Sequence, residues 1–230
     1  MTKAEVASVK KMAKRVVKQT AAGPRVKNAR TALALATQNA NRQDRRTFIM
    51  ASAAKLFATG GYAATTMDDL SALTKLNKGT VYYYYKSKAN ILYDISASAA
   101  TSLLNSMLPA IKMDKAVDGM THIISVMIRW VIQNRVFTQV YYQETRYFES
   151  VFSKAEYKVI REQQRQMTKI VHEVLNRGCA SGEFRPLDVT STGRFIIGLM
   201  QGMYRWPEHE IDVDSMIASA SDFVLRAVRR

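Results

Sequence analysis

The sequence of 230 residues is poor in several residue types, and each shortage excludes a class of protein. A single cysteine, Cys179, cannot form a disulfide within the chain. The three histidines are scattered without the spacing of metal ligands, so we expect no metal and no cofactor. No apolar run is long enough to span a bilayer, and the N-terminus lacks the apolar core of a secretory signal. These absences predict a cytoplasmic protein without a membrane partner.

Catalytic patterns are also absent from the sequence. It contains no clustered acid–base pair, no nucleophile motif and no glycine-rich phosphate loop. Glu144, His122 and His172 fall on amphipathic helical segments, where structural roles account for them. We therefore expect that the protein is not an enzyme.

Positive charge is abundant and unevenly distributed. The net charge is +15, and residues 1–92 hold 17 Lys or Arg against 4 Asp or Glu, whereas residues 93–230 hold 17 against 15. A basic segment beside a nearly neutral one is typical of a protein that binds a polyanion with one part only. A solvated basic tail would explain residues 1–46 but not the basic segment that follows. A basic arm at a membrane surface, from Lys3 to Lys18, is a second alternative.

Apolar residues recur at helical spacing throughout, which predicts an all-α fold. The four prolines fall between the periodic segments, as expected at helix boundaries. We divide the chain into a basic and flexible N-terminal extension (1–43), a domain of short helices (44–91) and a larger helical domain (92–230). In the second of these, a helix should begin at Asp44 and end at Gly60-Gly61. In the third, we expect helices at 87–107, 113–134, 137–149, 153–178, 188–206 and 212–229.

Two short helices joined by a tight turn predict a helix-turn-helix within residues 66–84. Thr66 and Asp69 have the spacing of a capping box. The second helix contains four consecutive tyrosines, Tyr82 to Tyr85, whose side chains must cover every face of the helix, so they should not act alike. Val81 and Tyr85, four residues apart, should point into the protein. The alternative is that the whole tyrosine run belongs to the core.

The segment FIMASAAKLFATGGYAATTMDDLSALTKLNKGTVYYYYKSKANIL resembles the DNA-binding domain of the tetracycline-repressor (TetR) family of bacterial transcription regulators. That family follows the patterns G-(F/Y)-x-x-(T/S)-(T/S) and K-G-T-(L/V)-Y-x-(H/Y)-F-x-(S/N)-K. The positions that match them are Gly61, Tyr62, Thr65, Thr66, Lys78, Gly79, Thr80, Val81, Tyr82, Ser87 and Lys88.

The resemblance implies a nine-helix fold that binds double-stranded DNA and dimerises. It implies that Thr80, Tyr82 and Tyr83 face the major groove, and that Thr66 and Lys88 hold phosphates at the ends of their helices. The DNA contacts we expect are Thr66, Lys78, Gly79, Thr80, Tyr82, Tyr83, Tyr84 and Lys88.

The sequence departs from the family pattern at three positions. Lys75 replaces the usual turn glycine and should take a positive φ unless the turn has another shape. Ala89 replaces a glutamate. Tyr85 replaces the usual phenylalanine and should be mostly buried.

The resemblance also implies that the larger domain binds an effector and forms a homodimer through the last two helices. Those helices carry small residues on one face, which allow helices to approach closely across a two-fold axis or, alternatively, within one chain. The small residues are Ser191, Gly193, Gly198, Gly202, Ala218 and Ala220.

The run from Gly182 to Trp206 resembles the subgroup of this family that responds to acyl-CoA thioesters in fatty-acid, aromatic and steroid degradation. Such an effector needs an apolar tunnel and cations for its phosphates. The alternative is a multidrug-type sensor of an unrelated hydrophobic or cationic small molecule. The principal candidate contacts are Met127, Trp130, Phe137, Tyr141, Arg146, Phe195 and Arg205, with Phe148, Met200 and Met203 as further apolar candidates and Arg129 and Arg194 as further cations.

These expectations combine into one hypothesis. The protein would be a homodimeric repressor that holds a palindromic operator until a hydrophobic effector changes the separation of its two recognition helices.

Overall fold

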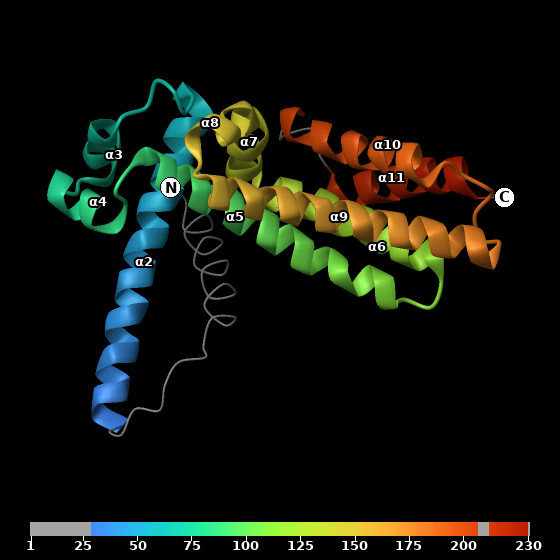
Figure 1. The fold of residues 1–230 in the computed structure, drawn as a ribbon, viewed down its shortest axis with the longest axis horizontal. Helices are drawn as coiled ribbons and strands as arrows, with labels where there is room; N and C mark the ends of the chain where they lie inside the picture. The colour runs from blue at the N-terminus through green and yellow to red at the C-terminus, as the bar shows by residue number, and fades with distance from the viewer. Residues whose placement is uncertain (1–28, 207–211, 230) are drawn as a thin grey trace. The chain divides into compact units, whose positions relative to one another are not determined.

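The computed structural model describes residues 29–206 and 212–229, and this part of the chain is helical, as predicted (Figure 1). The chain divides into two compact units with a boundary between Ile91 and Leu92. Strand pairing within the described residues is limited to one isolated bridge, between Phe184 and Arg229. None of the helices in this part of the chain combines the length and apolar character needed to cross a bilayer.

The first unit contains α2 (Ala29–Gly60), α3 (Met67–Thr74), α4 (Lys78–Tyr84) and the start of α5 (Lys88–Met107). The prediction that its first helix begins at Asp44 is wrong, because α2 begins at Ala29. Residues 29–43, assigned to the flexible extension, are therefore helical, and residues 1–28 lie outside the described part. The segment ARTALALATQNANRQ contains no glycine or proline and is rich in strong helix formers, which explains the longer helix.

The turns around α3 and α4 confirm the local predictions. Thr66 caps α3 in a reciprocal capping box with Asp69, with the Asp69 N–H donating to Thr66 Oγ1 at 3.1 Å and the Thr66 N–H donating to Asp69 Oδ2 at 2.8 Å. Lys75 ends α3 in the left-handed region with φ 55°, as expected from the missing glycine. Asn77 then caps α4, its Oδ1 accepting from the Thr80 N–H at 2.7 Å. These caps define the sharp turn between the two short helices.

Lys88, at the start of α5, forms hydrogen bonds to the loop that joins α2 to α3. Its ammonium donates to the carbonyl oxygens of Tyr62, Ala63 and Thr65 at 2.8, 3.0 and 2.9 Å. The same ammonium lies 4.5 Å from the ring centroid of Tyr62. Three donors thus meet three carbonyl groups of one loop, and the loop determines where α3 begins.

The second unit contains the rest of α5 and a bundle of longer helices. The helix expected at 137–149 is divided by a 3-10 turn, and those expected at 113–134 and 188–206 are shorter, each with a neighbouring 3-10 segment. The elements are η1 (Leu108–Lys112), α6 (Ala116–Gln133), α7 (Arg135–Glu144), η2 (Thr145–Tyr147), α8 (Phe148–Val151), α9 (Lys154–Ser181), α10 (Val189–Gln201), η3 (Gly202–Arg205) and α11 (Val213–Val228).

Helix α6 is the centre of this bundle and packs on α9 and α11. Its N-terminus has no side-chain cap of its own. Glu183, in the turn between α9 and α10, takes that place by accepting from the backbone N–H groups of Ala116 and Val117 at 3.0 and 3.1 Å. These hydrogen bonds lower the pKa of Glu183, so the contact is retained at neutral pH.

Replacing Lys88 with methionine should lower the free energy of unfolding by about 1 to 2 kcal/mol, because three carbonyl groups lose a charged donor. Urea unfolding followed by circular dichroism measures this. Lys86→Met is the matched control, since Lys86 is exposed two positions away, and it should change stability little. Equal stability of the two variants would show that the hydrogen bonds from Lys88 to the three carbonyl groups do not contribute to stability.

Candidate functional site

The tyrosine run on α4 is divided between the core and the surface. Val81 and Tyr85 are 0% and 1% exposed, whereas Tyr82 and Tyr83 are 42% and 58% exposed. Tyr84 is half-buried, and its ring meets that of Tyr83 edge to face at 5.1 Å. The spacing of Val81 and Tyr85 predicted this division. An exposed aromatic pair on a helix of this length is a surface available to a partner.

Charged groups tie α3 to α4 beside this surface. Lys78 donates to Asp68 Oδ2 at 2.7 Å, and Asp68 raises the pKa of Lys78, which therefore stays charged. The hydrogen bonds from Thr66 lower the pKa of Asp69. Contacts at the protein surface thus hold the start of α3 and join it to the start of α4.

Gly79 lies exposed in the first turn of α4. A Cβ atom built at this position would have Asn77 Oδ1 as its nearest neighbour, at 3.5 Å, which is an ordinary van der Waals distance. Its φ lies outside the left-handed region. The fold of the chain therefore does not require glycine here.

The eight residues predicted to contact DNA lie within the first unit, at the N-cap of α3, on α4 and at the start of α5. Lys88 differs from the others, because its ammonium faces three carbonyl groups of the preceding loop. The phosphate contact of Lys88 and the DNA contacts of the other seven stay predictions.

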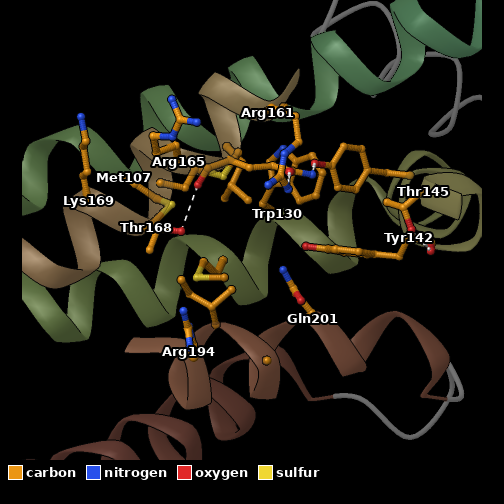
Figure 2. Close-up of a pocket in the computed structure, with 18 of the residues that line it drawn as sticks. Met107, Trp130, Tyr142, Thr145, Arg161, Arg165, Thr168, Lys169, Arg194 and Gln201 are labelled. Carbon is orange, nitrogen blue, oxygen red and sulfur yellow. Dashed lines mark hydrogen bonds between the residues drawn. The ribbon is translucent and has the colours of Figure 1, made fainter. Parts of the chain in front are cut away.

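The second unit contains a cavity of about 800 Å³ (Figure 2). Its apolar lining is deeply buried: Leu103, Met107, Met127 and Trp130 are between 0% and 7% exposed. The complete lining comes from α5, α6, α7, η2, α9 and α10 and consists of Ala100, Leu103, Met107, Met127, Trp130, Tyr141, Tyr142, Thr145, Arg161, Gln164, Arg165, Met167, Thr168, Lys169, His172, Arg194, Ile197, Gly198 and Gln201.

Cations surround the opening of this cavity. Arg161, Arg165 and Lys169 are spaced four residues apart on α9 and so share one face of that helix. Figure 2 shows them above the cavity, with Arg194 of α10 below. All four are exposed, and the lining within the described residues contains no aspartate or glutamate. The site therefore combines an apolar interior with a cationic rim.

Two tyrosines add polar groups to the interior. Tyr141 accepts a hydrogen bond from Gln164 Nε2 at 2.7 Å, and burial raises its pKa. Burial also raises the pKa of Tyr142, whose ring stacks on Tyr204 at 5.5 Å. Both hydroxyl groups are protonated at neutral pH and can donate to a ligand oxygen.

Sequence reasoning found part of this lining. Met127, Trp130 and Tyr141 line the cavity, and so does Arg194 among the further cations. The principal candidates outside the lining are Phe137, Arg146, Phe195 and Arg205. Phe195 is 74% exposed on α10, facing away from the cavity. The row of cations on α9 was missed, although its spacing of four residues is visible in the sequence.

A third feature is an apolar groove formed by α10, η3 and α11, with a volume of about 470 Å³. Leu199, Trp206 and Phe223 line it and are 44%, 48% and 60% exposed. Phe195, four residues before Leu199 on the same face of α10, is also exposed. Among the described residues, no group of His, Cys, Asp and Glu side chains could hold a metal ion.

Comparisons with known proteins agree with this geometry. Residues 113–228 match the family described as "Tetracyclin repressor-like, C-terminal domain", and residues 49–95 match "Bacterial regulatory proteins, tetR family". The HTH-type transcriptional regulator YhgD of Bacillus subtilis is 25% identical over 175 residues, which are 74% of this chain and 88% of YhgD.

Solved structures with the same fold include a bacterial regulatory protein of the tetR family from Rhodococcus RHA1. It is 27% identical, has a TM-score of 0.73, and the alignment covers 80% of this chain and 96% of that one. The regulator AibR, solved with isovaleryl coenzyme A and operator DNA, is 16% identical with a TM-score of 0.67, over 78% of this chain and 97% of AibR. At that identity the likeness to AibR concerns the fold alone.

Proposed function

This chain belongs to the TetR family of DNA-binding transcriptional regulators, and from that premise we propose that it is a homodimeric repressor whose cavity takes an acyl-CoA thioester. Proteins of this family regulate transcription in response to small molecules and are not enzymes. The observation that carries the effector proposal is the pairing of an apolar interior with a cationic rim.

DNA binding is assigned to α4. Tyr82 and Tyr83 offer aromatic edges and hydroxyl groups, and Thr80, which is half-buried, offers a further hydroxyl from the first turn. Such groups can contact base edges and thymine methyl groups in a major groove. Gly79 supports the same orientation: because the fold has room for a side chain there, a close approach of the DNA backbone accounts for its absence.

The effector is assigned to the cavity. An acyl chain would occupy the apolar interior, and the phosphates of coenzyme A would bind the arginines and the lysine at the rim. The tyrosine hydroxyl groups could donate to the thioester oxygen. The described lining has four cations and no carboxylate, which disfavours the cationic ligands of a multidrug-type sensor. The isovaleryl coenzyme A in the AibR complex is in keeping with this assignment.

Helix α5 belongs to both units, so a shift of this helix on effector binding could change the DNA-binding unit. Its first turn belongs to the first unit, and Ala100, Leu103 and Met107 farther along it line the cavity. An effector that binds one position of α5 better than another would shift the population of the DNA-binding arrangement. In a dimer, a changed separation of the two α4 helices would release the operator.

Replacing Gly79 with alanine should weaken binding to DNA from upstream of the protein's own gene, because the added methyl group would lie between α4 and the duplex. Stability should stay equal or rise by up to about 1 kcal/mol, since alanine favours helix more than glycine does. Fluorescence anisotropy measures the affinity and urea unfolding the stability. Gly60→Ala, at the end of α2, also has an uncrowded Cβ position and is the control. Equal affinity of both variants would contradict a close approach at Gly79.

Acyl-CoA esters should release the protein from that DNA, while free coenzyme A and a hydrophobic cation such as tetraphenylphosphonium should not. Anisotropy of labelled DNA, titrated with esters of increasing acyl length, measures the release. The double variant Arg161→Ala, Arg165→Ala should bind the effective ester at least roughly tenfold more weakly, because it can no longer form charged hydrogen bonds to the phosphates.

Lys158→Ala is the control for this experiment, because Lys158 is an exposed cation of α9 outside the lining. Release by tetraphenylphosphonium but by no ester would favour the multidrug-type sensor. An unchanged ester affinity in the double variant would refute the phosphate contacts.

The dimer is assigned to the apolar surface of α10 and α11. Replacing Phe223 with glutamate should convert the dimer to a monomer, because a charge would be buried at the centre of that surface. Light scattering coupled to size-exclusion chromatography measures the mass. Val159→Glu places the same charge at an exposed apolar position of α9, 44% exposed, and should leave the dimer intact. A dimeric Phe223→Glu variant would place the interface elsewhere.

A further inference from the structure

Residues 40–48 of α2 contribute little to the core of their unit. Within residues 40–60 of this helix the first buried residue is Ile49, and none of residues 40–48 is buried. Phe48, the last of them, is 40% exposed. Core packing therefore does not explain this stretch of the helix, since most helical stability in proteins comes from a buried face.

Arginines on this part of α2 lie against the tyrosines of α4. The guanidinium carbon of Arg42 is 5.4 Å from the ring centroid of Tyr83. That of Arg46 is 4.5 Å from the ring centroid of Tyr85, and Arg46 Nη1 lies 3.4 Å from the carbonyl oxygen of Tyr84. The side of α2 that bears these arginines is therefore the side next to α4.

Helical geometry separates these cations from the other charges of α2. At about 100° per residue, Arg45 and Arg46 lie within about 60° of Arg42, on either side of it. Asp44 and Lys55 lie about 140° to 160° away, on the other side of the helix. The arginines thus form a stripe without a carboxylate between them, and Arg42 and Arg45 are exposed.

From this stripe we infer a second DNA contact: Arg42 and Arg45 bind the phosphates of the duplex that flank the base pairs read by α4. The inference rests on the proposed DNA binding by α4, because the stripe borders the exposed ring of Tyr83. Guanidinium groups bind phosphate oxygens through two parallel donors, and Arg42 can do so while its flat face stays on the ring. Arg46 is a positioning residue, since its contacts hold the C-terminal end of α4.

Phosphate binding and base recognition differ in what they do to affinity. Removing one cation that binds a phosphate lowers the slope of log K against log salt by about 0.9. The removal also weakens binding to every DNA sequence alike, because phosphates carry no sequence information. A change at Tyr83, by comparison, should affect the specific sequence most.

The full-length protein and its variants should be titrated with a duplex from upstream of its own gene and with an unrelated duplex, across a series of salt concentrations. The double variant Arg42→Gln, Arg45→Gln should lower the slope of log K against log salt by about 1.8. It should weaken binding to both duplexes by the same factor. Arg45→Gln alone should lower the slope by about 0.9. Lys55→Gln, which removes the same charge from the other side of α2, should leave the slope unchanged. On a duplex trimmed to the base pairs under α4, the arginine variants and the wild-type chain should bind equally.

The outcomes distinguish a failure of the proposed DNA-binding function from a failure of the inferred phosphate contact on α2. If the wild-type chain does not bind the upstream duplex, the proposed function fails. If the wild-type chain binds but the arginine variants show the same salt slope as the wild type, then Arg42 and Arg45 do not bind flanking phosphates. The arginines of the stripe would then only hold α4 in place. The single variant Arg42→Gln, titrated in the same way, tests the other role of Arg42. If it weakens binding to the specific duplex alone, Arg42 acts by positioning Tyr83 and the inference is likewise refuted. Equal unfolding midpoints of all variants exclude a loss of fold.

Discussion

The burial of Val81 and Tyr85 is the interaction on which the DNA-binding surface depends. Helix α4 spans Lys78–Tyr84, too few residues to be stable by itself in water. Its orientation about its own axis is therefore determined by the side chains that it buries. With those two residues in the core, Tyr82 and Tyr83 have no interior position left and must be exposed. The surface that we propose reads DNA is thus a consequence of how the helix is anchored.

The cavity of the second unit depends on a different constraint. Any helical bundle needs apolar residues at helical spacing, so methionine and tryptophan side chains alone do not distinguish a ligand site from ordinary core. The distinction comes from the rim, where Arg161, Arg165, Lys169 and Arg194 add four cations to a lining that contains no carboxylate among the described residues, although Arg165 also pairs with Glu162 beside it. Exposed cations next to a deep apolar cavity are complementary to a molecule with an anionic head and an apolar tail.

The parts of the fold that local chemistry determines could be predicted from the sequence. Thr66 and Asp69 specify a capping box by their identities and spacing, and Lys75 has the positive φ expected for a residue in place of the turn glycine, rather than a turn of another shape. The start of α2 was missed, because residues 29–43 favour a helix by their composition, which a search for apolar repeats does not detect. Phe195 was assigned to the effector site although it faces outward, because periodicity shows that a face is apolar but not which neighbour covers it. The spacing of the cations on α9 is visible in the sequence. Their position beside the cavity depends on how α9 and α10 pack, and local sequence rules do not predict that packing.

The charges of the first unit lead to one more conclusion about how it meets DNA. Two lysines that the family pattern assigns to this surface already have partners within the protein: Lys78 pairs with Asp68, and the ammonium of Lys88 meets three carbonyl groups. A phosphate would have to compete with those contacts, and each one given up offsets part of the gain from binding. Arginine on an aromatic ring has no such conflict, because the ring occupies the face of the guanidinium and leaves its in-plane donors for phosphate. The long-range attraction of a basic segment can therefore come from all of its charges, while the close phosphate contacts that we propose are those of Arg42 and Arg45.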